Sequence, residues 1–454
     1  MTTTAAPVVT TSAGALGGRV RADAPVVEFL GVRYATAPRF APPEAVSGWS
    51  GVRDAVEHGP ASPQLRSIVD TVTGPSGDED AVQDEDCLRL DIRAPVAALT
   101  DGVPRPVLVW IHGGAYVIGS AATGWYDTTR LVVEGDVVTV NVGYRLGVLG
   151  WLRRPGIAPG NLGLLDVMAA LRWVRDEIAA FGGDPACVTA MGQSAGAHGI
   201  ACLMTVPEAR PLFRRAILQS GQLGLGLSSE ERAAKVGGYV VDALDGADPA
   251  TVDVSALLRA QRRAVIRAAG PGGLDSSPAF APVDGVAPLA PGTSWDDAAR
   301  SGHDLIVGST ADEIETFMEI NPVLRRVRRL PVLGRVAGGG SALVTRRVFG
   351  APARHLADQA ARAGSHVHHY RFDWRAPDSG LGACHCIELP FLFGTREAWR
   401  AAPMLAGADW DADIAPLGAR MRAAWLSFAR NGDPGADWPP HAPGAGPGAR
   451  FGSP

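Results

Sequence analysis

A serine set between two glycines is the residue in this sequence best placed to do chemistry. Gly192-Gln193-Ser194-Ala195-Gly196 follows the short apolar segment Val188–Met191 and precedes a run of small residues with helical composition. In a strand-to-helix context, Gly-x-Ser-x-Gly is typical of a sharp turn that exposes the serine hydroxyl, and its neighbours must be small because side chains would clash there. The pattern predicts that Ser194 is a nucleophile. The pentapeptide alone leaves a plain glycine turn as the alternative.

A second motif, His112-Gly113-Gly114-Ala115, directly follows the apolar segment Pro106–Ile111. Small residues at that position let backbone N–H groups approach a carbonyl oxygen, as in loops that supply part of an oxyanion hole. The N–H of the residue after the nucleophile, Ala195, completes such a hole. The alternative is again a glycine turn, but two such motifs in the expected order favour the oxyanion hole.

A serine hydroxyl needs a base, and the base needs an acid that orients it. With this nucleophile turn, the chain order is nucleophile, acid, histidine. The apolar segment Leu305–Val307 leads to Asp312 and Glu313, and either carboxylate fits the carboxyl end of a strand. Among the later histidines, His385 lies in a glycine-flanked loop after the predicted strand His366–Trp374, which favours it as the base.

Three further histidines, His366, His368 and His369, lie within that predicted strand. No other ligand residues lie near them at a recognisable spacing, so we expect these histidines to be structural residues of the strand and not metal ligands. His355 and His441 are the remaining histidines after the acid. The glycines at 221, 224 and 226 are in the wrong order for a dinucleotide motif. We therefore expect no metal and no cofactor.

Short β-branched segments alternate with helical patterns and could position these groups. Apolar spacing of three and four residues predicts a helix over Leu164–Phe181, ended by glycines, and another helix begins at Ala195. Further strands are predicted at Val137–Val142 and Phe213–Leu218. Apolar strands alternating with helices predict an α/β fold with a mostly parallel sheet covered on both faces.

The whole chain, residues 1–454, is interpreted as one domain with two additions. Residues 228–302 and 321–363 are rich in Ala, Arg and Gly with helical pieces, and we expect helical insertions over the active-site end of the sheet. The tail, residues 441–454, is rich in Pro and Gly, which predicts a disordered segment.

Composition excludes several other classes. The formal net charge of −5 gives no basic face for nucleic acid. No apolar run approaches the ~18 residues that span a bilayer. The N-terminal residues do not resemble a signal peptide and the five cysteines are an odd number, so we expect a reduced, cytoplasmic protein, with export by another route as the alternative. The sequence makes no prediction about the oligomeric state.

The motifs together resemble the type-B carboxylesterases, a family that also contains cholinesterases and bacterial nitrobenzyl-type esterases. The resemblance extends from about Gly14 to about Pro440. Besides the two glycine motifs, the matching segments are residues 29–43, 85–90, 144–147, 160–166, 181–185, 312–317, 382–394 and 425–434.

The resemblance implies the α/β-hydrolase fold and hydrolysis of a small-molecule carboxylic ester through an acyl-enzyme. It favours Glu313 over Asp312 as the acid of a Ser194–His385–Glu313 triad. It further implies roles for residues outside the triad: N–H donors at Gly114, Ala115 and Ala195, support from Gly113, a serine at Ser220 that supports the acid, and a Glu85–Arg145 salt bridge. A catalytically silent binding protein on the same fold is the alternative, although all three triad residues are present.

Four positions depart from the family pattern. Gln193 replaces a frequent Glu, Ile314 and Cys386 replace glycines, and Ser62 stands where secreted members place the disulfide partner of Cys87. We therefore expect Cys87 to be free. The loop from Ser62 to Cys87 contains no aromatic residue, whereas recognition of a quaternary ammonium requires an aromatic face, so a choline ester is not the expected substrate.

Overall fold

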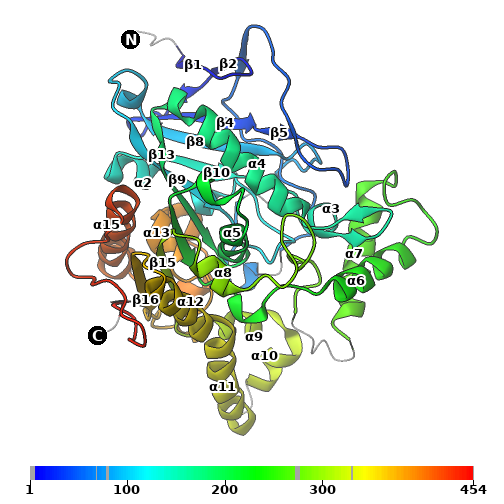
Figure 1. The fold of residues 1–454 in the computed structure, drawn as a ribbon. Coiled ribbons are helices and arrows are strands. Elements are labelled where there is room, and N and C mark those ends of the chain that lie inside the picture. The colour runs from blue at the N-terminus through cyan, green and yellow to red at the C-terminus, as the bar shows by residue number, and fades with distance from the viewer. Residues whose placement is uncertain (1–5, 68, 78–80, 271–276, 329–330, 453–454) are drawn as a thin grey trace.

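The computed structural model describes residues 6–67, 69–77, 81–270, 277–328 and 331–452. Its centre is a ten-stranded sheet (Figure 1). In spatial order the strands are β17 (Ala449–Phe451), β16 (Val367–Phe372), β15 (Asp304–Thr310), β14 (Arg215–Gln219), β13 (Gly183–Gln193), β9 (Arg105–Ile111), β10 (Val138–Val142), β8 (Arg89–Pro95), β4 (Val26–Arg33) and β3 (Arg19–Val20). Neighbours from β17 to β10 are parallel, and those from β10 to β3 are antiparallel. The prediction of a mostly parallel sheet is confirmed.

Both faces of the sheet are covered, and this explains the apolar strands. Every residue of β9 is buried. Val107, Val109 and Ile111 belong to one apolar cluster, and the alternate residues Leu108 and Trp110 belong to another. Successive side chains of a strand point to opposite faces of the sheet. A strand whose side chains pack into an apolar cluster on each face therefore has no polar face.

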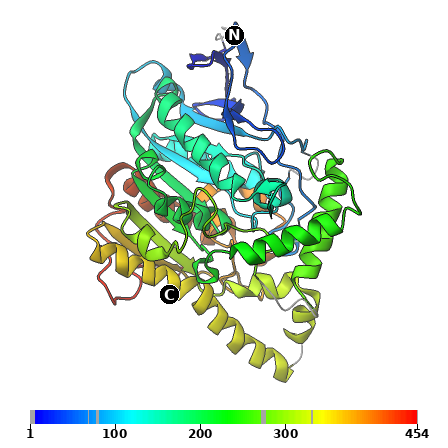
Figure 2. The same ribbon diagram turned by 45° about the vertical axis from the view of Figure 1, so that its right-hand side comes forward.

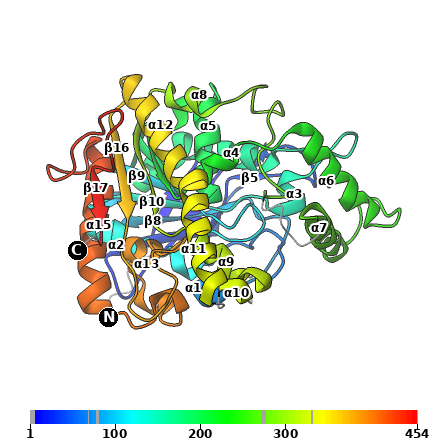
Figure 3. The ribbon, with the colours of Figure 1, turned by 90° about the horizontal axis from the view of Figure 1, so that it is seen from below.

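Helices from distant parts of the chain form the two covering layers (Figures 1 and 3). The first cluster contains side chains of α4 (Leu162–Glu177), α5 (Ala195–Thr205) and α12 (Ala351–Arg362). The second contains side chains of α2 (Thr129–Gly135), α13 (Leu389–Phe393) and α15 (Ala415–Asn431). The predicted helix Leu164–Phe181 corresponds to α4 and a following 3-10 turn, Ile178–Phe181, which ends at Gly182 with φ of 78°.

The two segments interpreted as insertions contain most of the remaining helices. Residues 228–302 include α6 (Glu230–Asp242), α7 (Val254–Ala268) and α8 (Trp295–Ala299). Residues 321–363 include α10 (Pro322–Arg328), α11 (Pro331–Thr345) and α12, and α9 (Ile314–Ile320) precedes them. Figure 2 shows α10 and α11 projecting from the body of the molecule, whereas α12 packs on the sheet.

Smaller elements complete the described chain. A three-stranded sheet contains β1 (Val8–Thr10), β2 (Ala15–Gly17) and β7 (Val52–Asp54). The short pairs are β5 (Ala35–Thr36) with β6 (Glu44–Ala45) and β11 (Arg153–Arg154) with β12 (Ala158–Pro159), and the short helices are α1 (Asp70–Thr73), α3 (Gly147–Trp151) and α14 (Arg396–Trp399). No helix in the described part of the chain is long and apolar enough to cross a membrane.

The prediction of a disordered tail is wrong for the described residues 441–452. Ala449–Phe451 forms β17, which pairs in parallel with β16 at the edge of the sheet. The His441 N–H donates to the Val367 carbonyl at 2.7 Å, and Phe451 is buried. Pro and Gly weaken local structure, but here backbone pairing and one buried ring hold the segment against a preformed strand. Residues 453 and 454 lie outside the described residues.

The expected Glu85–Arg145 salt bridge is not formed. Arg145 is buried and pairs with Asp166, in the first turns of α4, with an Nη2–Oδ1 distance of 2.7 Å. Glu85 instead accepts from Arg39, whose Nε lies 2.9 Å from its Oε2. A buried guanidinium requires a carboxylate partner that is equally buried, and Asp166 meets that requirement whereas Glu85 is partly exposed.

Candidate active site

Ser194 lies at the junction between β13, which ends at Gln193, and α5, which begins at Ala195. Its backbone has φ of 57° and ψ of −122°, a conformation that residues with a side chain rarely adopt. A Cβ atom on Gly196 would stand 2.0 Å from the Ile111 carbonyl oxygen, and one on Gly192 would stand 2.8 Å from the Gly196 carbonyl carbon. The two glycines therefore let α5 pack directly against the ends of β9 and β13.

Glu313 and His385 come from two other segments at the same edge of the sheet. Glu313 follows β15, and His385 lies in the loop between β16 and α13. The His385 Nδ1 is 2.5 Å from the Glu313 Oε2, and both side chains are buried. The Thr310 N–H donates to the other oxygen of Glu313 at 2.8 Å. A carboxylate accepts hydrogen bonds, so Nδ1 carries the proton and Nε2 is left as an acceptor.

The serine and the histidine each bind a neutral amide in this structure. Ser194 Oγ donates to Gln222 Oε1 at 3.3 Å. Nε2 of His385 lies 3.2 Å from Nε2 of Gln193, the side chain directly before Ser194. Among the described residues, Ser194 and His385 are not joined by a hydrogen bond. Rotation of the serine side chain away from Gln222 is therefore needed before its proton can reach Nε2, and catalytic hydrogen bonds often tighten only when substrate binds.

The loop after β9 lies against the serine turn. A Cβ atom on Gly113 would stand 2.8 Å from Gln193 Oε1 and 3.2 Å from Ser194 Cβ, so only glycine allows this approach. Gly114 and Ala115 both have positive φ, at 110° and 52°. Within the described chain, the N–H groups of Gly114, Ala115 and Ala195 donate no hydrogen bond. Free N–H groups beside a hydroxyl are suited to an oxyanion, and Ala195 adds the positive end of α5.

Glu388 is a buried acid that the sequence reasoning missed. Ser220 donates to Glu388 Oε1 at 3.4 Å and not to Glu313, so the expected support of the triad acid by Ser220 is corrected. Burial, reinforced by the negative charge of Glu313, raises the pKa of Glu388 to about 7. The available signal was an acidic residue only three positions after His385, within the matching segment 382–394.

The other predicted strand histidines lie away from this site. His368 and His369 are buried on β16 and His366 is exposed. Burial lowers the pKa of His369 to about 4. Among the residues that the structure describes, no three His, Cys, Asp or Glu side chains gather as a metal-ligand group. All five cysteines are free, Cys87 included.

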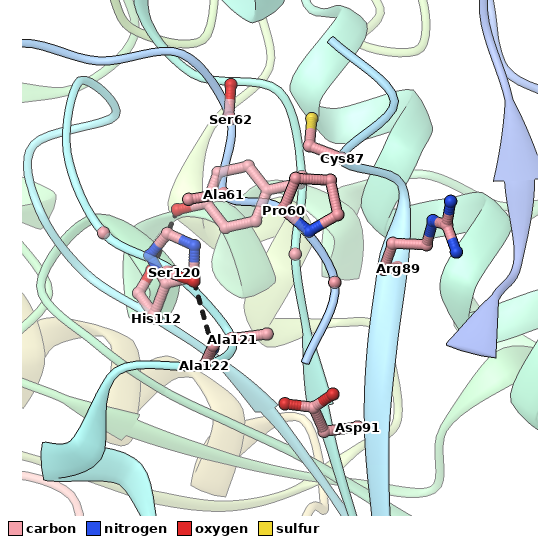
Figure 4. Close-up of a pocket in the computed structure, with 14 residues that line it drawn as sticks. Pro60, Ala61, Ser62, Cys87, Arg89, Asp91, His112, Ser120, Ala121 and Ala122 are labelled. Carbon is pink, nitrogen blue, oxygen red and sulfur yellow. Dashed lines mark hydrogen bonds between the residues drawn. The ribbon is translucent and has the colours of Figure 1, made fainter. Parts of the chain in front are cut away.

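A separate pocket lies beside the ends of β9 and β10 (Figure 4). Its lining includes His112, Asp91 and Ser120, and the Ser120 hydroxyl accepts from the Ala122 N–H at 3.0 Å. The residues that line it do not include Ser194, Glu313 or His385. This pocket is therefore separate from the group formed by Ser194, Glu313 and His385.

Comparison with known proteins agrees with the fold and the motifs. A profile of the Carboxylesterase family matches residues 5–326 and 336–447. The chain is 43% identical to the probable N-octanoylanthranilate hydrolase AqdA2 of Rhodococcus erythropolis, over 96% of this chain and 95% of that protein. It is 32% identical to the para-nitrobenzyl esterase of Bacillus subtilis, with 95% and 92% of the two chains covered.

Solved structures of carboxylesterases are also similar to this chain. The carboxylesterase EST55 of Geobacillus stearothermophilus superposes with a TM-score of 0.78 and 34% identity, over 95% of this chain and 93% of that one. The chain belongs to the carboxylesterase family and has the α/β-hydrolase fold. It is an enzyme of the carboxylesterase class, as the sequence resemblance predicted.

The acid can be tested by comparing two neighbouring carboxylates. Glu313→Gln keeps the shape but removes the charge that faces His385, and we expect kcat/KM to fall by about 10⁴-fold. Asp312 instead accepts the Ala383 N–H at 2.8 Å and pairs with Arg375, so it faces away from the imidazole. Asp312→Asn should lower kcat/KM by less than about tenfold. A larger loss of kcat/KM in Asp312→Asn than in Glu313→Gln would show that Glu313 is not the acid.

Glu388 gives a prediction for stability against pH. The pKa of Glu388 is raised from 4.5 to about 7 in the folded protein, so the folded state binds its proton more tightly than the unfolded chain. The free energy of unfolding is highest below pH 4.5, the pKa of the glutamate in the unfolded chain. It falls as the pH rises through the folded-state pKa of about 7, by about 3 kcal/mol in total. Glu388→Gln removes this dependence. The difference in Tm between the variant and the wild type should grow in favour of the variant from about pH 5 to about pH 8; a difference independent of pH would contradict the assignment.

Proposed function

We propose that this chain hydrolyses carboxylic esters with Ser194 as nucleophile, His385 as base and Glu313 as its orienting acid. The observation that carries the proposal is the buried Glu313–His385 pair beside the strained turn of Ser194. His385 Nε2 would take the serine proton as the hydroxyl attacks the ester carbonyl, and would then give it to the departing alcohol. Water would repeat the cycle on the acyl-enzyme.

The oxyanion of each tetrahedral intermediate would be bound by the N–H groups of Gly114, Ala115 and Ala195. Support comes from the fact that these N–H groups donate no hydrogen bond within the described chain. Donors fixed in advance in a dry site stabilise developing charge without reorganisation, and one such donor is worth about 10²- to 10³-fold in kcat. Binding of the carbonyl oxygen there would also bring the ester carbon to Ser194 Oγ.

The neutral amides of Gln193 and Gln222 would define the resting state. Gln193 binds Nε2 of His385, and Gln222 holds the serine hydroxyl. An ester that displaces these contacts would free the hydroxyl and the imidazole to meet. Neither amide adds a charge to the site, which supports an uncharged ester group as the reacting part of the substrate.

The nucleophile is tested by substitution and by labelling. Ser194→Ala should lower ester hydrolysis by at least about 10⁴-fold with an unchanged Tm, since alanine is accepted at the start of a helix. An organophosphate should modify the wild type at one residue, Ser194, identified by peptide mass spectrometry. Residual activity near that of the wild type, or a label on another serine, would overturn the assignment. A wild-type protein that binds esters without turnover would instead support the silent binding protein.

The bond that is cleaved is tested with a matched substrate series. The relative from Rhodococcus erythropolis is named for N-octanoylanthranilate, an amide, whereas the one from Bacillus subtilis is named as an esterase. Para-nitrophenyl esters of increasing acyl length should be compared with the para-nitroanilides of the same acids. We expect kcat/KM for each ester to exceed that for its anilide, because para-nitrophenolate is a better leaving group than para-nitroaniline. Faster cleavage of the anilides throughout the series would make the chain an amidase.

A further inference from the structure

A hydrogen bond between Tyr116 and His198 joins the oxyanion loop to the helix of the proposed nucleophile. The Tyr116 Oη lies 2.6 Å from the His198 Nδ1, and both side chains are buried. Tyr116 directly follows Ala115, and His198 is in the first turn of α5, where its N–H donates to the Ser194 carbonyl at 2.9 Å. The bond therefore links the two segments that supply the N–H groups proposed to bind the oxyanion.

The protonation of the pair is fixed by its surroundings. The His198 Nε2 lies 3.1 Å from the Gly226 carbonyl oxygen, which can only accept, so Nε2 carries the proton and Nδ1 accepts from the tyrosine. Burial lowers the pKa of His198 to about 4, which keeps the ring neutral at neutral pH. Trp295 packs edge-on against the same imidazole at 5.2 Å between ring centres. The histidine thus has one tautomer and one orientation.

The loop that Tyr116 anchors is strained. Ala115 and Tyr116 have φ of 52° and 64°, although neither is glycine. Each such residue costs about 1–2 kcal/mol and persists only where neighbouring contacts impose it. Tyr116 supplies those contacts: its carbonyl accepts the Gly147 N–H at 2.7 Å, and its ring packs on Trp151 at 4.3 Å. Loss of the hydroxyl bond would leave the loop free to relax relative to α5.

We infer that Tyr116 and His198 are positioning residues that hold the N–H of Ala115 and the N–H of Ala195 at a fixed separation. The inference rests on the proposed function, because it concerns the oxyanion hole of that site. An oxyanion requires its donors at about 2.7–3.1 Å. A shift of either segment would therefore reduce stabilisation of the transition state more than it reduces binding of the ester. A hydrogen bond that only stabilises the core would leave this geometry unchanged.

The test uses Tyr116→Phe and a matched control, Tyr34→Phe. Tyr34 is also buried, and its hydroxyl donates to the Gly143 carbonyl at 2.8 Å, so its variant loses the same kind of bond from a residue outside the proposed oxyanion loop and nucleophile helix. The measured quantities are Tm, kcat, KM and the affinity for a trifluoromethyl ketone. Ser194 Oγ adds to the ketone carbon, the serine proton passes to His385, and the resulting alkoxide occupies the oxyanion hole.

For Tyr116→Phe, we expect kcat and ketone affinity to fall together by about 10- to 100-fold, with KM within about threefold of the wild type. Tyr34→Phe should lower Tm to a similar extent with kcat and ketone affinity unchanged. His198→Gln, which retains an amide acceptor for the tyrosine, should keep more ketone affinity than His198→Leu.

Equal Tm losses in the two tyrosine variants with no loss of kcat or ketone affinity in Tyr116→Phe would overturn the inference, and so would equal ketone affinities for His198→Gln and His198→Leu. These results leave the proposed function intact if the wild type binds the ketone and Ser194→Ala does not. A wild type that fails to bind the ketone would overturn the proposed function and the inference together.

Discussion

The contact between Gly196 and the end of β9 is the constraint on which the rest of the site depends. The first turn of α5 lies so close to Ile111 that a single methyl group would meet its carbonyl oxygen at 2.0 Å. This approach lets the chain reverse from β13 into α5 at one residue, Ser194, with a backbone that few residues adopt. A wider separation of α5 from β9 would move the Ala195 N–H away from the loop after β9.

The surrounding site consists of buried polar groups that satisfy one another. The imidazole of His385 is held between the Glu313 carboxylate and the Gln193 amide, and the serine is held by Gln222. Buried polar groups without partners are costly, so these contacts fix side chains that would otherwise be mobile. The low dielectric strengthens the same interactions, and it also raises the pKa of Glu388, for which Ser220 is the side-chain hydrogen-bond partner.

Four separate segments meet at this edge because this part of the sheet is parallel. Strands β13 and β15 and the loop after β16 all deliver their residues at their carboxyl ends, and the loop after β9 reaches the same edge. The pairing of parallel strands fixes the height of each segment to within a residue. The Tyr116–His198 bond then adds a side-chain connection between two of the segments, across the gap that backbone pairing does not span.

The sequence by itself determined the local features of this protein. The glycines around Ser194, the small residues after β9 and the apolar strands follow from sterics and burial within a few residues of chain. Their order predicted an α/β fold with a mostly parallel sheet, and the resemblance of the motifs to a known family implied the α/β-hydrolase fold. Apart from the Glu313–His385 pair, which the family resemblance predicted, the tertiary structure decided which side chains are partners. Arg145 binds Asp166 rather than Glu85, Ser220 binds Glu388, and the tail forms β17 despite its composition. A partner is chosen by distance, burial and the strand edge that remains open, and residues far apart in the sequence acquire these only when the chain has folded.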